Sequence, residues 1–463
     1  MNTITLSTFS QEQPIYNYSI LGDLHVSIQI QENPYNIPLN SLFEMAARIN
    51  KKRGFLFVSK VLGKHIPVKP STSLLSGAAL AARFMEVFYQ RPSEISAIIE
   101  GLVKTDLSNS VFKEVSGQLL SLPEPVIFIG FAETATALGH SVFSRFQSQA
   151  TYVHTTREII EGIEPVITFE EEHSHAVAHR FYPIDLEVLR STSPIVLIDD
   201  EITTGRTALN IIREIQSKYP RKHYAVVSLL DWRSKEDCLR YKETEEELGI
   251  QITSVSLLKG EIQVSGSPVG SESDTTEYFT SDDVECVKEI NLNTVGMKRI
   301  AFPSINSTGS VNYTPYLQAT GRFGLCVSDQ RKFEFESEAL GTFLQKYRTG
   351  KTLCMGTGEF MYVPMMLSAY MGEEVWYQST TRSPIHPADC EGYAVKNKAS
   401  FICPDDPAVT NYFYNIPEGY YDDLFVFIER KTDHISLKSF YQAISKFGIP
   451  NKIAFFFSGE RGK

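Results

Sequence analysis

The chain has 463 residues, of which 42% are hydrophobic and 21% are charged, and its formal net charge is −11. This composition is typical of a globular protein with about two to four domains, and the negative charge argues against a general binder of nucleic acid or membrane surfaces. Six scattered cysteines without a C-x-x-C pair argue against a disulfide framework or a zinc knuckle. With no signal-peptide core and no run of 18 apolar residues, we expect a cytoplasmic protein without a membrane span.

Strand-like and helix-like apolar patterns alternate along the chain, which indicates an α/β fold with a parallel sheet flanked by helices. The elements expected in the first part are a β-like opening at 18–31, a helix at 39–49, a strand at 55–59, an ordered loop at 62–70, helices at 74–90 and 93–103, a strand at 126–129, a helix ending near 146, strands at 152–155 and 195–198, a helix at 207–218 and a strand at 224–230.

Residues 262–284 are rich in Ser, Gly, Thr and acidic side chains, and this shift in composition predicts a linker. It divides the chain into a first domain at 1–261 and a second at 285–463.

The second domain repeats the layout of the first. In the first, a buried strand leads into Gly130-x-x-Glu133, and Thr155-Thr-Arg157 follows 22 residues after Glu133. In the second, a strand leads into Gly356-Thr-Gly-Glu359, and Thr380-Thr-Arg382 follows 21 residues after Glu359. A later apolar run ends in Glu429 where the first copy has its acid pair. We therefore predict a degenerate copy of the same core, which lacks a Thr-Thr-Gly loop and is inactive.

The segment 195–207, IVLIDDEITTGRT, combines a buried strand, two carboxylates and a Gly- and Thr-rich loop that opens a helix. Ligands of open α/β sheets bind at the carboxyl ends of strands, and amides at a helix start suit a phosphate. Carboxylates suit the hydroxyls of a sugar or a hydrated Mg²⁺. The predicted ligand is therefore a sugar phosphate.

This segment resembles the phosphoribosyl-pyrophosphate (PRPP) loop of type I phosphoribosyltransferases: an apolar run, an acid pair, two residues, Thr-Thr-Gly, any residue and Thr. Glu201 departs from the usual small or aliphatic residue. The resemblance implies that Asp199 and Asp200 bind the ribose hydroxyls and Mg²⁺, in part indirectly, and act in catalysis. It also implies a PRPP-binding loop that comprises Glu201, Thr203, Thr204, Gly205, Arg206 and Thr207.

The loop Gly130, Phe131, Ala132 and Glu133 stands where type I enzymes hold the pyrophosphate. A glutamate such as Glu133 is unusual at this position. Three roles stay open for it: binding Mg²⁺, accepting a hydrogen bond from an amine of the base, and capping the helix. Lys64 is a further candidate for the pyrophosphate or the acceptor.

A histidine-rich segment at 169–180 stands where type I enzymes place a flexible lid that gives a cation to the leaving group and excludes water. A zinc site formed by three of these histidines and a solvated loop remain alternatives. The lid candidates are Arg157, His173, His175, His179 and Arg180, of which Arg157, His173, His175 and Arg180 are assigned to catalysis.

Thr381-Arg-Ser-Pro384 matches the motif that names the TRSP domain, and Gly321-Arg-Phe-Gly324 and Leu62-Gly-Lys-His65 fit the same resemblance. The chain thus resembles a bacterial family of orotate phosphoribosyltransferase-like enzymes with a C-terminal TRSP domain. Genes of this family often lie near tellurite-resistance and stress-response genes, and the resemblance implies the products of such neighbouring genes as partners. A low-ranked anion site in this domain comprises Gly356, Glu359, Arg382 and Ser383, with a structural Glu359–Arg382 bridge as the alternative.

The sequence thus predicts Mg²⁺-dependent transfer of phosphoribose from PRPP to a nitrogenous base or related acceptor, in nucleotide or nucleoside-like metabolism. A non-catalytic PRPP- or nucleotide-binding regulator and the reverse, cleaving reaction stay open. The acceptor is undetermined, and the resemblance leaves a homodimer open.

Overall fold

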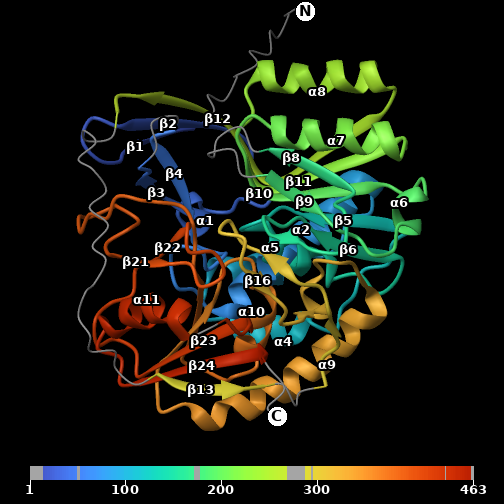
Figure 1. Ribbon diagram of the computed structural model, residues 1–463. Helices are drawn as coiled ribbons and strands as arrows, with labels where there is room; N and C mark the ends of the chain where they lie inside the picture. Colours follow the sequence, from blue (N-terminus) through green and yellow to red (C-terminus); the bar gives the residue numbers. More distant parts are fainter. Residues whose placement is uncertain are drawn as a thin grey trace, which may run out of the picture.

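The computed structural model describes residues 14–49, 53–170, 178–267, 287–292, 296–432 and 434–459. Two α/β halves lie against each other, one built around each predicted core (Figure 1). Within the described ranges, no helix has the length and apolar character needed to cross a membrane.

The first half is built on an eight-stranded sheet in the order β1-β2-β12-β11-β10-β5-β6-β18. Its five central strands are parallel, as predicted, and its edge strands are antiparallel. The strands are β1 (Ile15–Ser19), β2 (His25–Glu32), β5 (Val126–Gly130), β6 (Ala150–His154), β10 (Ile195–Ile202), β11 (His223–Asp231), β12 (Gln251–Ser265) and β18 (Leu325–Cys326).

Helices cover both faces of this sheet, and β10 is therefore buried on both sides. Ile195 and Leu197 join an apolar cluster with α7 (Arg206–Lys218), whereas Val196 and Ile198 join the cluster that contains α2 (Pro70–Tyr89) and α5 (Ala135–Phe143). In Figure 1 α7 and α8 (Lys235–Leu248) lie above the sheet, and the remaining helices of this half include α3 (Ser96–Val103), α4 (Ser108–Val115) and α6 (Glu187–Arg190).

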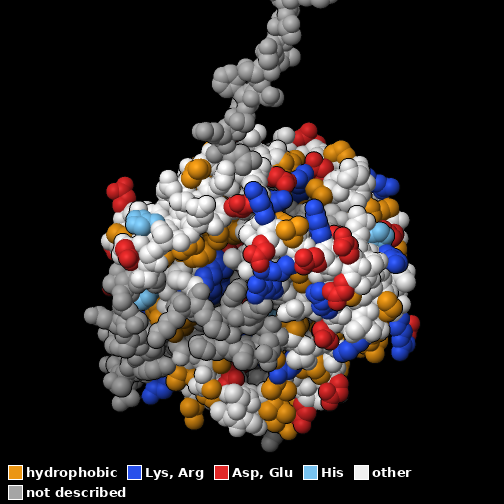
Figure 2. All heavy atoms as spheres, turned by 90° about the horizontal axis from the view of Figure 1, so that it is seen from above, with side chains coloured by type: hydrophobic (Ala, Val, Ile, Leu, Met, Phe, Trp, Pro, Cys, Tyr) orange, Lys and Arg blue, Asp and Glu red, His pale blue; other side chains and the backbone are white. Residues whose placement is uncertain are grey.

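The outer face over α7 and α8 carries interspersed basic and acidic side chains (Figure 2). Ion pairs such as Arg213–Glu247 join the two helices, and Arg240 pairs with Glu236 within α8. Neither sign of charge dominates this face.

The second half has a parallel five-stranded sheet in the order β13-β24-β23-β19-β20, packed against α9 (Val327–Leu344), α10 (Tyr362–Ala369) and α11 (His434–Ser445). The order β6-β5-β10-β11 in the first half is repeated as β20-β19-β23-β24 in the second, which agrees with the predicted degenerate copy. The strands are β13 (Lys288–Asn291), β19 (Thr352–Gly356), β20 (Val375–Ser379), β23 (Asp423–Arg430) and β24 (Asn451–Ser458).

Two predictions about local structure need correction. The helix expected at 39–49 is a single turn, α1 (Leu39–Leu42), followed by β3 (Phe43–Ala47), which pairs with β4 (Phe55–Ser59). Pairing with β4 and burial of most of the β3 side chains outweigh the local helical preference there. Residues 262–265 of the predicted linker belong to β12, which pairs with β2 as far as Ser265. Residues 268–284 of the predicted linker lie outside the described part.

Candidate phosphoribosyl site

The acid pair lies at the carboxyl end of the central strand β10, which extends four residues beyond its predicted end, to Ile202. The backbone N–H of Asp200 donates to Oδ1 of Asp199 at 2.9 Å. Burial raises the pKa of Asp200 above its ordinary value, and the nearby Glu201 adds to the rise. Two adjacent carboxylates with restricted solvation are suited to a hydroxyl pair or a cation.

The loop after β10 turns sharply at Gly205, where φ is 73°. A Cβ atom there would come within 2.3 Å of the Tyr241 hydroxyl oxygen, which donates to the Gly205 carbonyl at 3.0 Å. Helix α7 starts at Arg206 directly after this turn, with Thr207 in its first turn. The amide of Arg206 donates to the Thr204 hydroxyl at 3.4 Å, and the Thr203 hydroxyl donates to Glu201 at 3.2 Å. Amides and hydroxyls at a helix start are groups of the kind that bind phosphate.

Arg53 supports this loop from the N-terminal part of the chain, a role that the sequence reasoning missed. Its Nη1 donates to the Thr203 hydroxyl at 3.0 Å, and its Nη2 forms an ion pair with Glu201. The carboxylate of Glu201 is therefore engaged by the protein. The basic run Lys51-Lys-Arg53 is the signal in the sequence that could have pointed to this role.

The loop that follows β5 is fixed by hydrogen bonds within the protein. The amide of Phe131 donates to the Ile198 carbonyl at 3.1 Å, and the amide of Ala132 donates to the Thr155 hydroxyl at 2.9 Å. The Ala132–Glu133 peptide bond is cis. A Cβ at Gly130 would lie 2.5 Å from the Ala135 carbonyl oxygen. The two bonded amides therefore shape the loop and are not free donors.

Glu133 is the acidic centre of a buried ion-pair cluster at this loop. Its Oε1 lies 2.9 Å from Lys64 Nζ, and its Oε2 lies 3.3 Å from Arg157 Nη1. Burial alone would raise the pKa of Glu133, but Lys64, Arg157 and Arg382 hold it below its ordinary value. Burial lowers the pKa of Lys64, with Glu133 opposing the shift. Two predicted cations, Lys64 and Arg157, thus converge beside the predicted pyrophosphate loop.

The remaining lid candidates differ in placement. His179 is 1% exposed, and its ring accepts from or donates to Thr155 Oγ1 at 3.2 Å and accepts from Arg157 Nε at 3.3 Å. Arg180 donates to the backbone carbonyls of Arg157 and Ala178. Both residues support the Thr155–Arg157 turn from β9 (Ala178–Phe181), which pairs with β8 (Ile167–Glu170). His173 and His175 lie outside the described residues.

Of the four candidates for an anion site in the second half, Glu359 and Arg382 line one pocket. Arg48 donates to the Ser383 hydroxyl at 3.3 Å, and Gly356 packs its backbone against the Phe360 carbonyl. Glu359 pairs with Arg322 at 3.4 Å, and its charge also helps to raise the pKa of Arg382. Arg382 has Glu133 of the first half as its strongest electrostatic partner, which raises the pKa of its guanidinium against the effect of burial.

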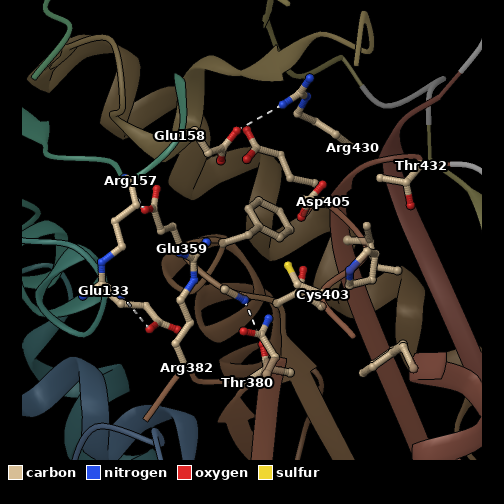
Figure 3. A pocket seen from close by; sticks show the side chains of 18 of the residues that line it. Glu133, Arg157, Glu158, Glu359, Thr380, Arg382, Cys403, Asp405, Arg430 and Thr432 are labelled. Carbon is tan, nitrogen blue, oxygen red and sulfur yellow. Dashed lines mark hydrogen bonds and ion pairs between the residues drawn. The ribbon is translucent and has the colours of Figure 1, made fainter. Parts of the chain in front are cut away.

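A pocket of about 60 Å³ lies between the halves, lined by Glu133, Arg157 and Glu158 from the first and by Glu359, Thr380 and Arg382 among others from the second (Figure 3). Arg322 anchors its wall: this guanidinium is 1% exposed and pairs with three carboxylates, those of Glu158, Glu359 and Glu429. The sequence flagged Gly321-Arg-Phe-Gly324 as a motif, but it gave no sign of this cluster.

Comparisons with known families agree with this architecture. Residues 42–261 match the family described as phosphoribosyl transferase, and residues 319–444 match the one described as a TRSP domain C-terminal to that transferase. The first half of the chain is thus similar to a phosphoribosyl transferase domain, and the second half is similar to the TRSP domain that follows such a transferase.

Similar solved structures include adenine phosphoribosyl transferase from Trypanosoma brucei, with 12% identity, 53% of this chain and 90% of that chain covered and a TM-score of 0.29. The enzyme from Leishmania donovani shows 14% identity, coverage of 52% and 86%, and a TM-score of 0.26. The enzyme from Giardia lamblia shows 18% identity, coverage of 34% and 83%, and a TM-score of 0.21. A comparison with curated proteins gives no match.

Proposed function

We propose that this protein transfers phosphoribose from PRPP to a nitrogenous base or related acceptor, with Mg²⁺. The observation that carries the proposal is the acid pair and Thr-Thr-Gly loop of β10, set beside the Gly130–Glu133 loop by strand pairing of Ile198 with Gly130. This arrangement puts groups for the sugar, its phosphate and a leaving group at one edge of one sheet.

We assign each part of PRPP to groups of this site. The carboxylates of Asp199 and Asp200 accept from the ribose hydroxyls. The hydroxyls of Thr203 and Thr204 and the amides that open α7 hold the 5-phosphate. Lys64 and Arg157 lie where negative charge grows on the pyrophosphate as its bond to C1 breaks, and preorganised cations favour that step.

The donor set also fits Mg²⁺. Oxygen ligands from Asp199 and Asp200 are of the kind that Mg²⁺ prefers, and it usually binds one or two carboxylates together with substrate phosphates. Within the described ranges no three His, Cys, Asp or Glu side chains form a metal-binding group, so the phosphates of PRPP would complete the coordination. The ion would neutralise and orient the pyrophosphate.

Glu133 favours a second candidate function, a PRPP-binding regulator. Its carboxylate already neutralises Lys64 and Arg157, the cations that a leaving pyrophosphate needs. In an enzyme, the pyrophosphate group of PRPP has to compete with Glu133 for Lys64 and Arg157. In a regulator, the ion pairs of Glu133 with these two cations prevent catalysis.

The test is pyrophosphate release from PRPP and Mg²⁺ against a panel of purines, pyrimidines and simple amines. Acceptor-dependent release that disappears in Asp199→Asn/Asp200→Asn establishes the transferase and names its acceptor class. Tight PRPP binding without turnover on any acceptor supports the regulator, and no PRPP binding contradicts both.

A further inference from the structure

The two halves share their loop hydrogen bonds as well as their strand order. The Thr155 hydroxyl accepts from the amide of Ala132 at 2.9 Å, and the Thr380 hydroxyl accepts from the amide of Gly358 at 2.9 Å. Thr156 exchanges backbone bonds with Arg180, and Thr381 exchanges them with Tyr412. The hairpin β8–β9 thus has its counterpart in β21 (Lys398–Ile402) and β22 (Thr410–Tyr414).

Each half also sends one loop onto the other. The carbonyl of Gly63 accepts from Ser379 in β20 at 2.7 Å, and the carbonyl of Gly321 accepts from His154 in β6 at 3.4 Å. A Cβ on either glycine would come within 3 Å of a tyrosine ring, Tyr377 for Gly63 and Tyr152 for Gly321. The halves are therefore related to each other like the subunits of a symmetric dimer that exchange equivalent contacts.

The basic residue after each of these glycines pairs with equivalent acids. Lys64 pairs with Glu133, and Arg322 pairs with Glu359. Strand register sets Ile198 beside Gly130 and Phe427 beside Gly356, so Glu429 takes the place of Asp200. Arg322 holds Glu429 in an ion pair at 3.0 Å. The acid of the second copy is thus already occupied by the protein.

Glu359 reaches from the second half into the first. Its Oε2 accepts from the Thr156 hydroxyl at 2.6 Å, and its Oε1 accepts from the backbone N–H of Arg157 at 2.8 Å. Arg157 in turn points its guanidinium toward Glu133 (Figure 3). The turn that carries Arg157 is therefore held by a carboxylate from the other half of the chain.

We propose that the second half acts as a built-in partner subunit whose Glu359 is a positioning residue for the phosphoribosyl site, holding the Thr156–Arg157 turn so that Arg157 faces the pyrophosphate loop. This inference rests on the proposed function. Glu359 touches no substrate; it acts through Arg157, and the first half is incomplete without it.

The test is calorimetric titration of the full chain with PRPP and Mg²⁺. Glu359→Ala removes both acceptors, so the PRPP Kd should rise at least tenfold. Glu359→Gln keeps an oxygen for the Arg157 amide and an amide for Thr156, so it should stay within about threefold of wild type. Thr156→Val breaks the contact from the first half and leaves the Arg322 cluster intact. Glu391→Ala, an exposed carboxylate of the second half, is the matched control.

Because Glu359 and Thr156 share one contact, the double variant should bind PRPP no more weakly than the weaker single variant. Should Glu359→Ala fail to fold, Thr156→Val carries the test. Folded Glu359→Ala or Thr156→Val with wild-type affinity overturns the positioning role and leaves the proposed function standing. If the wild type itself does not bind PRPP, the proposed function falls and the role of Glu359 falls with it.

Discussion

Lys64 Nζ lies 2.9 Å from Glu133 Oε1, and the two side chains are 3% and 7% exposed. Removing one partner of a buried ion pair leaves an uncompensated charge, which typically costs about 3 kcal/mol. Lys64→Met should therefore lower the free energy of unfolding by about that amount in urea denaturation at neutral pH. Lys64→Met/Glu133→Gln should recover part of the loss, and equal stability of Lys64→Met and wild type would contradict the buried pair.

Gly205 is predicted to tolerate no side chain. In Gly205→Ala, the new side chain has to adopt a left-handed backbone conformation, and its Cβ would lie 2.3 Å from the Tyr241 hydroxyl oxygen. We expect it to weaken PRPP binding and to lower stability by clearly more than Gly309→Ala. Gly309 has φ of 85° with open space around it, so its variant isolates the backbone cost of about 1 kcal/mol. Thermal melts and PRPP titrations of both variants test this prediction. Equal losses of stability in the two variants would rule out the clash with Tyr241.

Stability should fall at mildly acid pH. Burial lowers the pKa of His140 to about 3, so the folded chain keeps this ring neutral while the unfolded chain protonates it below pH 6.5. The free energy of unfolding should then decrease by about 1.4 kcal/mol for each pH unit between 6.5 and 3 from this residue. The buried rings of His65 and His154 add slopes of the same sign.

Urea denaturation at pH 5, 6 and 7 measures this slope. His140→Gln should reduce it by about 1.4 kcal/mol per pH unit whatever the variant's stability at pH 7. An unchanged slope in the variant would show that His140 is not held neutral in the folded protein.

PRPP should bind with one molecule per chain. The first copy offers Asp199 and Asp200, whereas Glu429 of the second is engaged by Arg322, and Ile428 stands where Asp199 would be. Titration calorimetry gives the ratio directly. A ratio of two would mean that the second copy binds PRPP despite its altered acids.

The sequence predicted those features that local patterns of residues determine. The parallel strands, the acid-pair loop and the repeat each show in a continuous segment, because apolar periodicity and turn residues mark them. The predicted helix at 39–49 failed because β3 depends on a partner strand. The first residues of the predicted linker continue β12, because they pair with β2 across the sheet.

Long-range pairing explains the other omissions. Arg53 meets Glu201, and Arg322 meets Glu158, across more than a hundred residues. No spacing along the chain links such charges. The contact of Glu359 with Thr156 depends on how the two halves pack against each other, and the sequence of either half alone does not predict that packing.

The most direct measurement is PRPP binding in Mg²⁺ by three forms of the full chain: wild type, Asp199→Asn/Asp200→Asn, and Glu243→Gln/Glu246→Gln on the exposed face of α8. All three should melt at similar temperatures. The account predicts that the wild type and the α8 variant bind alike and that the acid-pair variant loses binding. Unchanged binding in the folded acid-pair variant would contradict the phosphoribosyl site.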